Sequence, residues 1–184
     1  GRGVDDALLE LDGTDRKERL GGNVTTGVSL AAARAAAEAR GVPLYRHVAA
    51  RVGDGVRLPY PVFDMIEGGE LADSPLDFQE HQLVPVGADS VAEAIRMAAE
   101  TYAELGDLLA ARYGTGACAL GVEGGYTPAV EDPTEAFDAL LEAAERAGYA
   151  DDVVLSVDAA ATHLYDAATG TYRVAGERLA PDEL

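Results

Sequence analysis

The 184-residue chain has few basic residues and is especially poor in lysine. Lys17 is its only lysine, and 14 Lys plus Arg stand against 33 Asp plus Glu, which gives a formal net charge of −19. Nucleic acids and anionic membranes bind to basic patches, so this balance argues against both as partners. An acidic, lysine-poor composition favours a halophilic protein, because salt screens the self-repulsion. A GC-rich genome also favours arginine over lysine, and the composition leaves that explanation open.

Cysteine and long apolar runs are also scarce. A single cysteine, Cys118, excludes an internal disulfide and a cysteine metal cluster, and it favours a cytoplasmic protein. No run approaches 18 uninterrupted apolar residues, so the sequence predicts no transmembrane helix. The first residues have neither an initiator Met nor the apolar core of a signal peptide, and we expect that the sequence starts inside a longer chain.

The first third of the sequence predicts helices. Residues 24–40 are rich in alanine and are followed by Gly41 and Pro43, which are typical of a helix end. A shorter helical pattern covers residues 43–53. We expect a domain boundary near residues 52–59.

The remainder alternates predicted strands with predicted helices. Ser90 and Glu93 form a capping box, and Asp132 with Pro133 marks a second helix start. This alternation indicates an α/β architecture. Strand patterns cover residues 57–66, 75–87 and 152–161, and a hairpin pattern that turns at Thr169-Gly170 covers the tail.

Three acidic residues lie near predicted strand ends. Asp158 follows the apolar segment "VVLSV", Glu80 lies in "FQEHQL", and Glu123 lies in the glycine-rich stretch "LGVEGGYTP". In α/β barrels, ligands bind at the C-terminal ends of the strands. Three carboxylates that meet there can bind a hard cation such as Mg²⁺, or can hold a carboxyl with a raised pKa that acts as a general acid. Solvated loop carboxylates are the alternative that the pattern leaves open.

Five segments of the sequence, in this order, resemble the enolase family, the phosphopyruvate hydratases of glycolysis. They are "LDGTDRKERLGGNVTTGVSLAAARAAAEARGVPLYRHVA", "LPYPVFDMIEGGE", "FQEHQLVPVGADSVAEAIRM", "LGVEGGYTP" and "LSVDAAATHLYD". The resemblance implies an α/β fold in which residues 56–184 form the first, incomplete part of an enolase-type (β/α)8 barrel. Residues 1–55 then form the helical part of an α+β amino-terminal domain.

The resemblance also implies a function and assigns roles to residues. The function is the Mg²⁺-dependent dehydration of 2-phosphoglycerate, a small anionic substrate, by a homo-oligomeric carbon–oxygen lyase. Glu123 corresponds to the catalytic proton donor to the departing hydroxyl, and Asp158 corresponds to a Mg²⁺ ligand. Gln79 and Glu80 correspond to substrate contacts, and Glu80 shares in the catalytic proton network. We therefore predict that these four side chains lie around the opening of one active site.

Several positions depart from the family pattern. Glu67, Glu70 and Leu71 replace the Asn, Ser and His of the family's mobile flap, and Val122 and His163 replace two acids. The base lysine, two further metal ligands and the phosphate-binding Arg and Ser lie later in an enolase, so we expect no catalysis by these 184 residues alone. A paralogue acting on another 2-substituted acid, and a non-catalytic binding protein, are the alternative hypotheses.

Overall fold

The computed structural model describes residues 2–53 and 55–184, without the side chains of Arg2 and Leu71. The chain divides into two compact units, Gly1–Leu58 and Pro59–Leu184. Residue 54 falls inside the expected boundary segment and lies outside the described residues. The predicted division into domains 1–55 and 56–184 stays a prediction.

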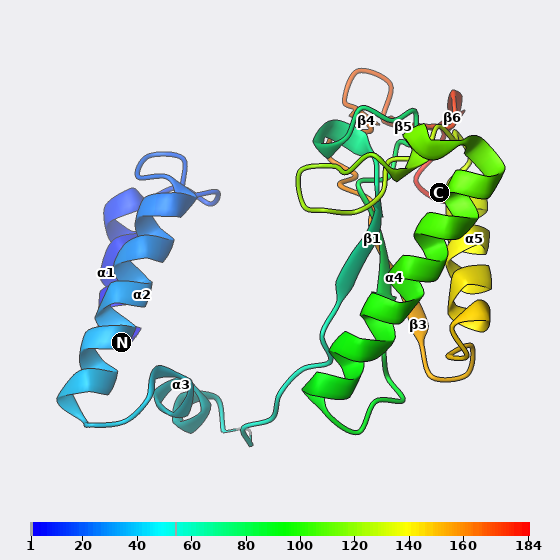
Figure 1. The fold of residues 1–184 in the computed structure, drawn as a ribbon. Helices are drawn as coiled ribbons and strands as arrows, with labels where there is room; N and C mark the ends of the chain where they lie inside the picture. Colours follow the sequence, from blue (N-terminus) through cyan, green and yellow to red (C-terminus); the bar gives the residue numbers. More distant parts are fainter. Residues whose placement is uncertain (1, 54) are drawn as a thin grey trace. The chain divides into compact units, whose positions relative to one another are not determined.

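The first unit consists of three helices in its described part: α1 (Arg2–Asp12), α2 (Gly22–Ala39) and α3 (Leu44–Val52) (Figure 1). The two helices predicted from the sequence are α2 and α3. Gly41 and Gly53 follow their ends with φ of 65° and 85°, a left-handed conformation that glycine adopts without strain.

The second unit is built on a three-stranded sheet of β1 (Phe63–Glu67), β2 (Glu80–Val84) and β3 (Val154–Asp158). The predicted α/β class is confirmed, since helices cover this sheet. Both strand pairs are antiparallel. β2 runs opposite to its neighbours, so its first residue, Glu80, lies at the same end of the sheet as Glu67 and Asp158, the last residues of β1 and β3.

The strands are shorter than the sequence patterns predict. β1 begins at Phe63, after Pro59 and Pro61. Proline has no amide hydrogen to donate to a neighbouring strand, so residues 57–62 do not join the sheet. A 3-10 helix, η1 (Gly69–Leu71), and a loop occupy much of the chain between β1 and β2.

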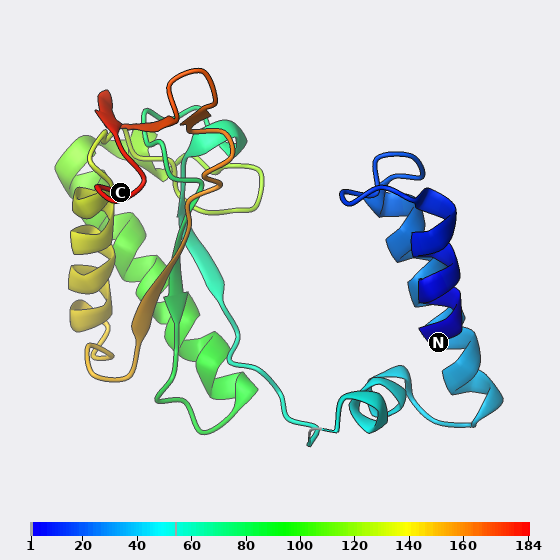
Figure 2. The ribbon, with the colours of Figure 1, turned by 180° about the vertical axis from the view of Figure 1, so that it is seen from behind.

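Two long helices, α4 (Val91–Tyr113) and α5 (Pro133–Arg146), lie together on one side of the sheet (Figures 1 and 2). The predicted caps are present: Ser90 Oγ accepts a hydrogen bond from the Glu93 amide at 3.1 Å, and Asp132 Oδ1 accepts one from Thr134 at 2.8 Å. Large buried side chains from the sheet and helices form the core, among them Met65, Ile66, Leu76, Leu83, Leu105, Leu108, Leu109 and Leu140.

The rest of the second unit is a short 3-10 helix, η2 (Thr115–Cys118), and a small antiparallel sheet. The sheet consists of β4 (Tyr165–Asp166), β5 (Thr171–Val174) and β6 (Glu177–Leu179), and the predicted turn at Thr169-Gly170 joins β4 to β5. Among the described residues, no helix has both the length and the apolar character needed to cross a membrane.

Candidate active site

A row of three carboxylates crosses one end of the sheet. In the strand register, Glu67 of β1 lies opposite Glu80 of β2, and Glu80 lies opposite Asp158 of β3. The neighbouring His81 is buried and its ring lies 4.7 Å from that of Phe137 in α5. Successive strand residues point to opposite faces, so Glu80 and its two register partners point away from the helices.

A β-bulge adds a fourth carboxylate to this face. Asp64 pairs with Gln82 while Ile66 pairs with His81, so β1 has one extra residue there. The bulge lets Met65 and Ile66 both pack in the core, and it turns Asp64 to the same face as Glu67. Without the bulge, residues three apart in a strand lie on opposite faces. Burial, followed by the charge of Glu67, raises the pKa of Asp64 to about 8.

Glu123 reaches this row from the loop of residues 121–125. Its side chain is exposed, and its carboxyl is hydrogen-bonded to that of Glu80. This bond and the charge of Glu80 raise the pKa of Glu123, and the charges of Glu67 and Asp158 act in the same direction. Glu80 also accepts a hydrogen bond from Gln82 Nε2 at 2.7 Å. The arrangement makes the Glu123 carboxyl easier to protonate than an ordinary glutamate, and it leaves that carboxyl facing solvent, as a proton donor requires.

Gln79 lies one residue before the row, in the loop that leads into β2. Its side chain lines a neighbouring cavity of about 350 Å³, together with Glu70 and His163. His163 Nδ1 lies 3.3 Å from Glu70 Oε1, so two of the positions that depart from the family pattern contact each other. The structure thus brings Glu80, Glu123 and Asp158 together and places Gln79 beside them, while their roles stay predictions.

Three residues of this face were not predicted as site residues: Asp64, Glu67 and Gln82. Glu67 was interpreted as part of the flap, but it is fully buried at the end of β1. Its Oε1 accepts hydrogen bonds from the amides of Glu123, at 3.0 Å, and Gly125, at 2.6 Å. Gln82 lies two residues after Glu80 in β2, so both side chains point to the same face, and this spacing is visible in the sequence. The sequence held no comparable signal for Asp64, because its orientation depends on the bulge.

The face matches a divalent-cation site in chemistry but not in ligand number. Carboxylate oxygens suit Mg²⁺, and the buried carboxylate oxygens Asp64 Oδ1, Asp64 Oδ2 and Glu67 Oε2 have no hydrogen-bond partner. Within residues 2–53 and 55–184, however, no group of three or more His, Cys, Asp or Glu side chains is placed to hold a metal ion. Asp158, whose Oδ1 accepts the Ala160 amide at 2.8 Å, therefore fits as a single ligand that needs others from elsewhere.

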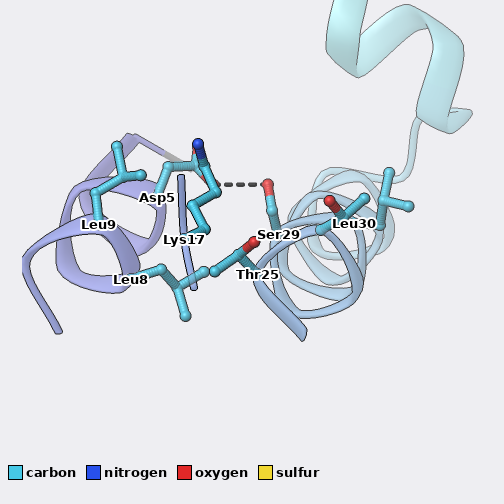
Figure 3. A pocket seen from close by; sticks show the side chains of 8 residues that line it. Asp5, Leu8, Leu9, Lys17, Thr25, Ser29 and Leu30 are labelled. Atoms are coloured by element: carbon cyan, nitrogen blue, oxygen red, sulfur yellow. Dashed lines mark hydrogen bonds between the residues drawn. The ribbon is translucent and has the colours of Figure 1, made fainter. Parts of the chain in front are cut away.

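Another cavity, of about 310 Å³, lies in the first unit between α1 and α2 (Figure 3). Leucines line much of it, and Ser29 Oγ donates a hydrogen bond to Asp5 at 2.6 Å. Lys17 also reaches it. Its chemistry differs from that of the acidic face, because its one described acid is already hydrogen-bonded.

Comparisons with known proteins cover nearly the whole chain. Residues 1–48 match the model of the enolase N-terminal domain, and residues 55–183 match that of the enolase C-terminal TIM barrel domain. An enolase of Methanopyrus kandleri is 49% identical over 98% of this chain and 42% of its own length. An enolase of Methanothrix thermoacetophila is 44% identical over 100% of the chain and 43% of its own length, and enolase B of Dictyostelium discoideum is 42% identical over 93% and 39%. The chain thus spans less than half the length of these relatives.

Proposed function

The chain belongs to the enolase family, and from this premise we propose that it supplies part of an active site that dehydrates 2-phosphoglycerate to phosphoenolpyruvate. Two matched domains in one chain, and 49% identity to a curated enolase, support the proposal. The single observation that carries it is the place of Glu123: Glu67 holds its loop at the row of Glu67, Glu80 and Asp158 on the open face of the sheet.

The reaction needs an acid at this place. Once the α-proton of 2-phosphoglycerate has been removed, the electron pair left on that carbon forms the new double bond and the C–O bond of the neighbouring hydroxyl breaks. Hydroxide is a poor leaving group, so a proton must reach the oxygen as the bond breaks, and the product is water. We assign this proton transfer to Glu123, whose pKa is raised by its hydrogen bond to Glu80 and by the charge of Glu80.

Glu80 and Gln79 support the same step. Glu80 keeps the Glu123 carboxyl in place and shares its proton, while Gln82 orients Glu80 from the neighbouring position on the same face. Gln79 contacts the substrate from the adjoining cavity. We assign Asp158 as one Mg²⁺ ligand, and a bound Mg²⁺ stabilises the negative charge that the substrate carboxylate gains when the proton leaves.

Replacement of Glu123 tests this proposal. We expect that the complete gene product carrying this sequence converts 2-phosphoglycerate to phosphoenolpyruvate, and that Glu123→Gln lowers kcat by ~10²- to 10⁴-fold because it removes the acidic proton. The product is followed by its ultraviolet absorbance. Glu131→Gln, at an exposed position a few residues further along, is the matched control and should leave kcat unchanged. An inactive wild-type protein, or equal activity of the Glu123→Gln variant, would refute the assignment.

The metal assignment has its own test, which does not depend on turnover. We expect Asp158→Asn to weaken Mg²⁺ binding by at least ~10-fold in calorimetry, because a charged ligand is lost. Asp151→Asn, at an exposed position before β3, is the control that should bind Mg²⁺ as the wild type does. Equal affinity in all three proteins excludes Asp158 as a ligand.

We further propose a cytoplasmic, halophilic homo-oligomer. Enolase-family membership supports the assembly and the compartment, and the net charge of −19 supports the salt requirement. Sedimentation tests the oligomeric state. Thermal unfolding at ~0.2 M and ~2 M KCl tests the salt requirement, because screening by salt should raise the stability of so acidic a protein. Equal stability at both salt concentrations argues that a GC-rich genome, and not adaptation to salt, explains the scarcity of lysine.

A further inference from the structure

Glu67 contacts the Glu123 loop through both its main chain and its side chain. The Glu67 amide donates to the Tyr126 carbonyl at 2.9 Å, which fixes the end of the loop against β1. The side chain extends inside the loop, where its Oε1 accepts the amides of Glu123 and Gly125. A buried carboxylate that accepts two backbone N–H groups makes strong, charge-assisted hydrogen bonds.

The loop is shaped around this carboxylate. A Cβ atom on Gly121 would overlap Glu67 Oε2 and would lie 2.5 Å from Glu67 Cδ. A Cβ atom on Gly125 would lie 2.7 Å from Asp64 Oδ2 and 2.9 Å from Glu67 Cγ. These distances are shorter than any van der Waals contact, so both loop positions require glycine because the two acids fill the space. The "LGVEGGYTP" stretch is therefore matched to the acid at position 67.

Asp64 supplies what the second oxygen of Glu67 needs. Glu67 Oε2 is buried and has no donor among the described residues. Asp64 lies against Glu67 and, with its pKa raised to about 8, keeps a proton at neutral pH that it can donate to this oxygen. A single proton between the two carboxyls then satisfies one oxygen of each and removes one of two adjacent negative charges.

We propose that Glu67 is the positioning residue of the acid loop: its carboxylate fixes the backbone at Glu123 and Gly125 and thereby holds the Glu123 carboxyl beside Glu80. This inference rests on the proposed role of Glu123 as the proton donor. Glu67 itself is buried beneath the loop and does not touch the substrate. Its effect on catalysis is geometric, and a displacement of the acid by about 1 Å is enough to lower the rate ~10²-fold.

Three substitutions of Glu67 test the proposal in the complete gene product. Glu67→Gln keeps the length and an oxygen that accepts both amides, so we expect the loop and kcat to stay within about threefold of wild type. Glu67→Ala removes the hydrogen-bond acceptor. Glu67→Asp shortens the side chain by one methylene group and so moves the acceptor away from the two amides. We expect both to lower kcat by ~10- to 10²-fold with a much smaller change in KM, because the acid is misplaced while the substrate contacts remain.

Hydrogen–deuterium exchange supplies a readout that does not depend on activity. Peptides covering residues 121–126 should exchange at least ~10-fold faster in Glu67→Ala and Glu67→Asp, and at the wild-type rate in Glu67→Gln. Peptides from β2 report global unfolding, and we expect their exchange to stay unchanged in Glu67→Asp even if Glu67→Ala unfolds. Unchanged loop exchange in Glu67→Asp and Glu67→Ala overturns the proposal. An inactive wild type with faster loop exchange in these variants refutes only the proposed reaction and leaves the loop anchor established.

Discussion

The two faces of the β1–β2–β3 sheet differ in chemistry and in their effect on stability. On the face toward α4 and α5, Ile66, Leu83 and the neutral ring of His81 pack into a continuous core. Burial lowers the pKa of His81 to about 4, so its ring carries no charge at neutral pH. On the opposite face, acids lie side by side across the strands, and among the described residues none of these acids forms an ion pair.

One face of the sheet stabilises the fold, and the other carries the acids of the proposed active site. Apolar burial stabilises the helix-covered face by about 25 cal/mol per Å². The acidic face opposes folding, because carboxylates repel one another and lose hydration when they are buried. Sites that keep such unfavourable groups are typically functional, and Asp64 and Glu123 both have raised pKa values there.

The largest loss of stability should come from the helix-covered face. Leu83→Ala leaves a cavity at a fully buried position, and we expect it to lower the free energy of unfolding by about 3 kcal/mol. Val154→Ala, at a strand position that is 48% exposed, should cost less than about 0.5 kcal/mol. Urea denaturation of the complete gene product measures both, and equal losses would mean that the core does not lie where the structure places it.

A smaller loss should come from crowding the acidic face. Gly121→Ala puts a methyl group where the buried Glu67 carboxylate lies, and we expect a loss of about 2 kcal/mol. Gly116→Ala, which has no atom within 4 Å of the new methyl group, is the control. Glu67→Ala should partly relieve the Gly121→Ala defect, and strictly additive effects would contradict the contact.

The acidic face should also make stability depend on pH. Asp64 loses its proton near pH 3.8 in the unfolded chain but near pH 8 in the folded one, so the folded state binds more protons between these values. Its contribution to stability is fully present below pH 3.8 and is lost as the pH rises through about 8. We expect Asp64→Asn, which stays neutral, to exceed the wild type by ~2 kcal/mol at pH 8 in denaturant titrations and by less at pH 5. A wild-type difference between pH 5 and pH 8 that persists unchanged in Asp64→Asn would exclude Asp64 as its source.

The smallest effect should come from the outer surface of the helices. Glu142 of α5 pairs with Arg112 of α4 and, at 2.7 Å, with Arg146. All three side chains are at least 35% exposed, so water and salt screen the pairs. We expect Glu142→Gln to change the free energy of unfolding by about 0.5 kcal/mol. A loss as large as that of Leu83→Ala would show that the helix layer depends on ion pairs.

Local patterns predicted the helices better than the strands. The Ser90 and Asp132 caps lie within a few residues of the groups they bind, so the sequence marks both helix starts. The buried stripe of α4 has no such local mark: its apolar residues Val91 and Ile95 are 45% and 52% exposed, while Leu105 and Leu109 are buried. The spacing of apolar residues along a helix does not decide, to within one residue, which side of α4 is buried. Contacts from the sheet and α5 decide it.

The sequence by itself determined the family motifs, the helix ends and the acidic, lysine-poor surface, because each depends on composition or on residues close together in the chain. Only the tertiary structure decided which acids meet. The reversal of β2 puts Glu80 between Glu67 and Asp158, and the bulge in β1 turns Asp64 to the same face. Both depend on pairing between strands far apart in sequence, where a shift of one residue sends every side chain to the other face.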